Sequence, residues 1–84
     1  MSRILIVDDN ETLGSGVVLM LARMGHEGVA VTNGPEGLAR MKEQVYDLVI
    51  TDYRMDEMDG LEVLEAIKGQ APETDVMMMT AYGT

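Results

Sequence analysis

Four short apolar runs recur along this 84-residue chain, and each has the length of a single strand. Short runs of aliphatic and β-branched residues are typical of strands that are buried on both faces. Because the chain contains no Cys, disulfides and thiolate metal sites are excluded, and the core must come from these runs and the helices between them. The runs are Ile4 to Val7, Val29 to Thr32, Leu48 to Thr51 and Val76 to Met79.

The first interval between these runs has the pattern of an amphipathic helix. Asn10 is a suitable N-cap and Gly25 a suitable C-terminal stop. Gly14 and Gly16 interrupt the helix and leave two interpretations open, because they either permit a close approach by another element or weaken the first turns. The apolar residues that repeat at helical spacing are Leu13, Val17, Met20, Leu21 and Met24.

The second and third intervals begin with a capping-box pattern, in which an N-cap residue is followed by Glu at the third helical position. Asn33 and Glu36 form this pair in the second interval, and Asp59 and Glu62 form it in the third. The alternation of strands and helices predicts a parallel sheet with right-handed crossovers and helices on both faces. The expected buried residues are Leu38, Met41 and Val45 in the second helix, and Leu61, Leu64 and Ile67, with Val63 beside them, in the third.

Acidic residues stand at the carboxyl ends of two predicted strands, since Asp8 and Asp9 follow the first run and Asp52 follows the third. The carboxyl ends of parallel strands share one rim of the sheet, where α/β proteins place their chemistry. Three carboxylates held together repel one another unless a cation is supplied, and oxygen-only ligands suit Mg²⁺. The sequence therefore predicts a Mg²⁺ pocket in which Asp52 accepts a phosphoryl group. Thr80, after the fourth run, would donate a hydrogen bond to that group.

These residues resemble the receiver domain of two-component response regulators, and four separated pieces agree with it in order and spacing. The resemblance implies a flavodoxin-like, doubly wound parallel sheet with the strand order 2-1-3-4. It also implies that Asp52 receives its phosphoryl group from the phosphohistidine of a sensor histidine kinase. The four pieces are Ile4 to Asn10, Asp52, Met55 to Gly60, and Thr80 with Ala81.

The same resemblance implies a role for each residue of the site. Asp9 and Asp52 would ligate Mg²⁺ directly, and Asp8 would act through water. The backbone carbonyl of Arg54 would complete the ligand set, and Thr80 would be the switch hydroxyl that follows the phosphoryl group. The chain would not be an enzyme, beyond Mg²⁺-dependent phosphorylation and dephosphorylation of itself.

The ending from Thr80 to Thr84 is similar to receivers attached to nitrogen-regulation-type activators, which work with an alternative sigma factor. This likeness implies a transcription-activating output domain that is absent from the chain. The family domain continues through a fourth helix, a fifth strand and a fifth helix, so residues 1–84 are expected to be a single receiver domain truncated after its fourth strand.

Three further features depart from the family pattern. Asp56 stands where the family usually has Pro, and Gly14 and Gly16 stand where it usually has ordinary helix formers. None of the six basic residues ends a strand at the predicted active rim, so the family's phosphoryl-binding lysine is missing. Loss of a preorganised cation is expected to weaken stabilisation of the phosphoryl group.

The incomplete sheet supports an alternative function, that of a signalling-incompetent fragment that self-associates as a structural module. The missing elements would leave the edge of the fourth strand and part of the first helix uncovered, and exposed apolar surface marks an interface. A two-fold homodimer is the simplest expectation. A Mg²⁺-dependent phosphatase is disfavoured, because such enzymes need an acid two residues after the nucleophile, where this chain has Asn10 or Arg54.

The charge balance limits the partners. Fifteen acidic residues against six basic residues give a net charge of −9, which disfavours direct binding to nucleic acid by this segment. No apolar run approaches the length that crosses a bilayer, and no signal-peptide pattern precedes the first strand. A cytoplasmic protein with no membrane partner is expected.

Overall fold

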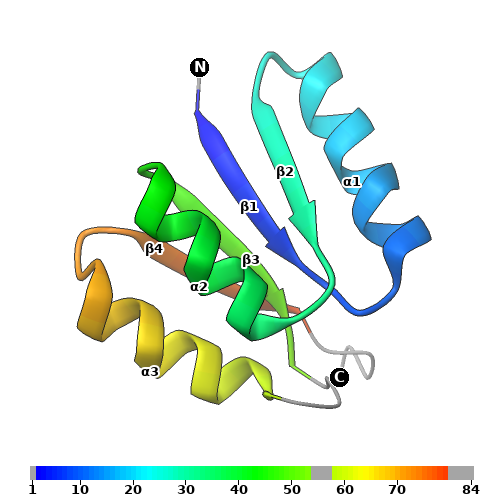
Figure 1. The fold of residues 1–84 in the computed structure, drawn as a ribbon. Helices are drawn as coiled ribbons and strands as arrows, with labels where there is room; N and C mark the ends of the chain where they lie inside the picture. Colours follow the sequence, from blue (N-terminus) through cyan, green and yellow to red (C-terminus); the bar gives the residue numbers. More distant parts are fainter. Residues whose placement is uncertain (1, 54–57, 80–84) are drawn as a thin grey trace.

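A computed structural model describes residues 2–53 and 58–79, within which strands and helices alternate along the chain (Figure 1). The elements follow the predicted order, although β1, β2 and β4 begin before the apolar runs that indicated them. The strands are β1 (Arg3–Val7), β2 (Glu27–Val31), β3 (Leu48–Asp52) and β4 (Asp75–Met79). The helices are α1 (Glu11–Arg23), α2 (Gly34–Glu43) and α3 (Gly60–Gln70).

The four strands form one parallel sheet in the order β2-β1-β3-β4, which confirms the predicted fold class and strand order. The strands also end nearly level with one another, because Val7 lies opposite both Val31 of β2 and Thr51 of β3. The arrowheads of β1, β2 and β3 in Figure 1 point toward the same end of the sheet, and β4 pairs with β3 in the same direction. The carboxyl ends of the strands therefore share one rim of the sheet.

The main hydrophobic core lies between the sheet and the pair α2 and α3, which lie next to each other (Figure 1). Alternate side chains of a strand face opposite sides of a sheet, so Gly28 and Ala30 of β2 face away from this core. Helix α1 packs on that second face, with Val18 against Gly28. The sheet thus has helices on both faces, as predicted. The buried members of the core are Leu5, Val7, Val31, Tyr46, Val49, Val63 and Ile67.

The predicted buried faces of α2 and α3 are partly wrong. Helix α2 ends at Glu43, before the periodic pattern runs out, so Val45 falls in the following segment and is 80% exposed. Tyr46, one residue later, enters the core in its place. In α3, Val63 and Ile67 are buried on the side that faces the sheet, whereas Leu61 is 49% exposed.

The apolar stripe predicted for α1 is also largely uncovered. Leu13, Met20 and Met24 are exposed. Within Glu11–Arg23, which the structure describes throughout, only Gly14 is buried. Helix α1 approaches the small residues of β2 through Gly14, Val18 and, from the predicted stripe, Leu21. The remaining stripe residues Leu13, Met20 and Met24 lie to the side of this contact and stay exposed. On the same face of the sheet, Met77 of β4 is 54% exposed, so β4 is not buried on both faces as its sequence suggested.

The structure separates the two glycines of α1. A Cβ placed on Gly14 would lie 3.3 Å from the Cβ of Ala30, whereas a Cβ on Gly16 would meet nothing within 4 Å. Gly14 therefore serves the close approach of α1 to β2. At Gly16 no close approach requires glycine, so this residue only weakens the helix.

We expect Gly16→Ala to raise the free energy of unfolding by about 0.5–1 kcal/mol, because Ala restricts the unfolded chain and meets no obstacle in the folded one. Gly14→Ala is expected to gain less, because Ala30 must move to admit the methyl group. Urea denaturation of the two variants measures the difference. An equal gain in both would contradict the assigned role of Gly14.

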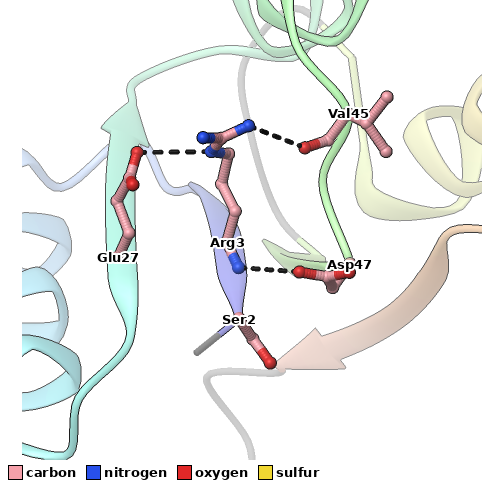
Figure 2. A pocket seen from close by; sticks show the side chains of 5 residues that line it. All are labelled: Ser2, Arg3, Glu27, Val45 and Asp47. Atoms are coloured by element: carbon pink, nitrogen blue, oxygen red, sulfur yellow. Dashed lines mark hydrogen bonds and ion pairs between the residues drawn. The ribbon is translucent and has the colours of Figure 1, made fainter.

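The amino end of the sheet is joined by polar contacts of Arg3, as Figure 2 shows. Its guanidinium forms an ion pair with Glu27 at 3.3 Å and donates to the carbonyl of Val45 at 3.5 Å. Its backbone N–H donates to the carboxylate of Asp47 at 2.8 Å. Together with Ser2 these residues line a hollow of about 320 Å³. Arg3 thus connects β1 to β2 and to the segment before β3, at the opposite end of the sheet from the predicted site.

Candidate functional site

The structure brings together the three aspartates that the sequence placed at the carboxyl ends of strands. Asp8 and Asp9 directly follow β1, and Asp52 is the last residue of the adjacent strand β3. Carboxylate oxygens of the three residues lie within 4.8 Å of one another. We call Asp8, Asp9 and Asp52 the acidic cluster. Its position follows from the register, because Val7 pairs with Thr51 and the next residue of each strand is an aspartate.

Asp8 is the buried member of the acidic cluster, with 3% of its surface exposed. Burial raises the pKa of its carboxyl group, and the nearby charges of Asp52 and Asp9 raise it further. A hydrogen bond from the backbone N–H of Asn10 at 2.9 Å opposes this shift and lowers the pKa. The charged form of Asp8 therefore lacks sufficient compensation from the protein, which is the condition that a bound cation would correct.

The turn that carries Asp8 and Asp9 into α1 is held by Asn10. Its side-chain oxygen accepts a hydrogen bond from the backbone N–H of Leu13 at 3.1 Å, as expected of an N-cap. Its own backbone N–H donates to Asp8. One residue thus fixes both the start of the helix and the orientation of the buried carboxylate.

The chain after Asp52 is held close to β3 by Gly60. The N–H of Gly60 donates to the carbonyl of Tyr53 at 2.8 Å, and the N–H of Tyr53 donates to the carbonyl of Met79 at 2.8 Å. A Cβ on Gly60 would lie 2.7 Å from the carbonyl oxygen of Asp52, which is shorter than real contacts allow. In the sequence, Gly60 stood out only as the last residue of the matching piece Met55 to Gly60, and its contact with Asp52 was not predicted.

The acidic cluster fits a divalent cation bound by oxygen. Three carboxylates of like charge face one another, and none of the ion pairs found among residues 2–53 and 58–79 involves them. Hard oxygen donors of this kind are the ligands that Mg²⁺ takes in proteins. The geometry therefore supports a metal-binding role for the three aspartates.

Two predicted site residues lie outside the described part of the chain. These are Arg54, whose backbone carbonyl was expected to ligate the metal, and Thr80, the expected switch hydroxyl. Asp56, which replaces the usual Pro of the family, also lies there.

The helices of residues 2–53 and 58–79 include none with the length and apolar character of a membrane span.

The profile of the response regulator receiver domain matches residues 4–84. Among curated relatives, the transcriptional regulatory protein ZraR of Klebsiella oxytoca is 40% identical over 81 residues, which is 96% of this chain and 18% of that protein. The transcriptional regulatory protein GlrR of Escherichia coli (strain K12) is 37% identical over 83 residues, or 99% of this chain and 19% of that protein. The chain thus spans about a fifth of the regulators it matches.

Solved structures agree with this match. The response regulator TrrA of Thermotoga maritima, crystallised with Mg²⁺ and BeF, superposes with a TM-score of 0.91 at 35% identity, covering 99% of this chain and 72% of that one. TrrA in complex with the histidine kinase ThkA gives a TM-score of 0.92 at 34% identity, covering 100% and 72%. The chain belongs to the family of response regulator receiver domains.

Proposed function

We propose that this domain receives a phosphoryl group on Asp52 from a sensor histidine kinase, with Mg²⁺, and thereby controls a transcription-activating output domain. The observation that carries the proposal is the acidic cluster, whose carboxylate oxygens lie within 4.8 Å of one another. Support comes from TrrA, which was solved with Mg²⁺ and BeF and with the histidine kinase ThkA, and from the transcriptional regulatory proteins ZraR and GlrR.

In this proposal a carboxylate oxygen of Asp52 forms a bond to the phosphorus of the donor phosphohistidine. The phosphorus–nitrogen bond breaks, and the imidazole nitrogen keeps the electron pair. The product on Asp52 is an acyl phosphate. Mg²⁺, when bound, neutralises charge on the phosphoryl oxygens and on the carboxylates. Asp52 suits the nucleophilic role because it is only half-buried, whereas Asp8 is enclosed.

The other residues of the proposed site act around this reaction. Asp9 and Asp52 would hold the cation together with the carbonyl of Arg54, and Asp8 would act through a water molecule. Thr80 would donate a hydrogen bond to the phosphoryl group. Catalysis by the chain would be limited to its own phosphorylation and dephosphorylation. The domain would act in the cytoplasm, and it would not bind nucleic acid itself.

Incubation with a small phosphodonor and Mg²⁺ tests the proposal through intact mass. We expect a gain the size of one phosphoryl group in the wild-type chain and none in Asp52→Asn. Asp75→Asn is the matched control, because Asp75 is exposed at the start of β4, at the other end of the sheet, and it should be modified normally. No gain in the wild type, or an equal gain in Asp52→Asn, would refute the proposal.

A second proposed function is self-association as a homodimer through the edge of β4 and the outer face of α1. The observation that favours it is apolar exposure on one side of the sheet. Met77 lies on the same face as α1, because Ala30, Ile6, Ile50 and Met77 form one row across the four strands. The exposed apolar residues of this side include Leu13, Met20, Met24 and Met77.

We expect the weight-average molecular mass to rise with protein concentration. The rise should be stronger in high salt, because salt screens the repulsion between copies that each carry a net charge of −9. Met77→Lys should suppress the rise. Val45→Lys is the control, since Val45 is exposed at the amino end of the sheet. Sedimentation equilibrium measures both variants, and a monomer at every concentration and salt level would exclude this function.

A further inference from the structure

Strand β2 is the outermost strand of the described sheet on the side of α1 (Figure 1). The N–H of Glu27 donates to the carbonyl of Ser2, and the carbonyl of Val31 accepts from Asp8, so alternate residues from Glu27 to Val31 bond toward β1. The residues between them point their backbone groups to the other edge. The N–H and C=O groups of Gly28 and Ala30 therefore face away from the sheet.

The middle of this edge lacks the residues that most often prevent strand addition. Proteins protect edge strands with charged side chains, above all Lys, and with Pro or bulges, and the charged residue of β2 is Glu27 at its start. Residues Glu27–Val31 contain neither Lys nor Pro, and β2 pairs with β1 in one continuous register. The two residues with outward-facing backbone groups are also the smallest of the strand, so their side chains do not shield those groups.

An apolar hollow lies directly beside the edge. It has a volume of about 450 Å³ and is lined by Ser15, Val18 and Leu19 of α1 and by Gly28 and Ala30 of β2. Leu19 is 68% exposed above it. The small residues of β2 bring the helix close to the strand, since a Cβ on Gly28 would lie 3.3 Å from the Cα of Val18. A side chain from an added strand would therefore enter the space beneath α1.

A second hollow of about 430 Å³ adjoins the first toward the carboxyl end of β2, and the two share Ser15 and Ala30. This second hollow is acidic, because Asp8, Glu11 and Glu36 all line it. None of the ion pairs within the described residues involves these carboxylates. The groove between α1 and β2 thus runs from an apolar part to a negatively charged part.

We propose that this groove binds an extended peptide segment of another protein as an added strand beside β2. The peptide backbone pairs with Gly28 and Ala30, as in other cases of strand addition to a sheet edge. One apolar side chain fills the hollow beneath Leu19. Because alternate side chains of a strand point to the same face, the residue two positions along also lies on the α1 side, where it is basic and lies against Glu11 at the acidic hollow.

The test uses short threonine-rich peptides that carry one Leu and one Lys two positions apart. Both orders, Leu-Thr-Lys and Lys-Thr-Leu, are needed because the added strand can run in either direction. Fluorescence anisotropy should show binding of one order, and replacement of its Lys by Glu should weaken binding by about tenfold or more. Hydrogen exchange at the amides of Gly28 and Ala30 should slow when the peptide is bound. Failure of both orders to bind would overturn the proposal.

Two variants separate strand addition from non-specific attraction. Ala30→Pro removes an outward N–H without removing a bond to β1, and Leu19→Lys adds a charge to the hollow at an exposed position. Each should weaken peptide binding by about tenfold or more, whereas Val45→Lys should not change it. If Ala30→Pro does not fold, Leu19→Lys carries the test alone. Unchanged peptide binding in Leu19→Lys would overturn the proposal. It would also be overturned if no peptide binds and Ala30→Pro abolishes a dimer of the wild-type chain, because the strand added beside β2 would then come from a second copy of this chain.

Discussion

Asp8→Asn is expected to stabilise the metal-free protein at neutral pH and to weaken Mg²⁺ binding at the same time. The substitution removes a buried charge from beside Asp9 and Asp52, which should raise the free energy of unfolding by on the order of 1 kcal/mol. It also removes a group that helps to hold the cation, which should lower Mg²⁺ affinity by roughly 10- to 100-fold. Urea denaturation without metal and calorimetric titration with Mg²⁺ measure the two effects.

The pH dependence of stability follows from the direction of the same shift. The pKa of Asp8 is raised in the folded state above its ordinary value of 3.8, so the folded protein binds this proton more tightly than the unfolded chain does. The metal-free protein should therefore gain stability as the pH falls from neutral through the raised pKa of Asp8. Saturating Mg²⁺ should oppose this gain, because a cation favours the ionised carboxylate.

Asp8→Asn should make the gain in stability on acidification smaller than in the wild type. Asp75→Asn serves as the control, since Asp75 is exposed and lies at the other end of the sheet. It should leave both the pH dependence and Mg²⁺ affinity close to those of the wild type. Equal pH dependence in Asp8→Asn and the wild type would contradict the account of the acidic cluster as an uncompensated group of charges.

Gly60→Ala is expected to be the most destabilising Gly→Ala substitution in the described part of the chain. The added methyl group would lie 2.7 Å from the carbonyl oxygen of Asp52 and 2.8 Å from the Cα of Tyr53, and both atoms belong to the backbone. Overpacking of this kind costs about 1–3 kcal/mol, and a rigid backbone places this site at the upper end. The strand end that carries Asp52 must shift, so the rate of phosphorylation should fall as well.

Gly69→Ala, in the same helix, is the matched control. A Cβ on Gly69 meets nothing within 4 Å, so this change should stabilise the protein by about 0.5–1 kcal/mol. Urea denaturation and the phosphorylation rate are measured for both variants. Similar stability of Gly60→Ala and the wild type would show that α3 can move away from the end of β3 without cost.

The sheet and the acidic cluster could be predicted from the sequence because they depend on chain order and strand ends. Four apolar runs separated by capped helices allow few arrangements other than a parallel sheet, and its shared rim then collects Asp8, Asp9 and Asp52. These inferences need only local patterns and one general rule about parallel strands.

The packing of the helices could not be predicted in the same way. Helical periodicity gave Val45 as a buried residue, yet α2 ends at Glu43 and Tyr46 fills the core. It gave Leu13 as buried, yet α1 contacts β2 through Gly14. The folded arrangement determines where a helix ends and which small residues it approaches. The helical periodicity of the sequence predicts neither of these features.

Mapping the modified residue shows whether Asp52 accepts a phosphoryl group within a metal-dependent acidic cluster. The chain is incubated with a small phosphodonor, with and without Mg²⁺, and its peptides are analysed by mass spectrometry. We expect a single modified residue, Asp52, in the presence of Mg²⁺ and little modification without it. Modification at another residue, or equal modification of Asp52 without Mg²⁺, would contradict it.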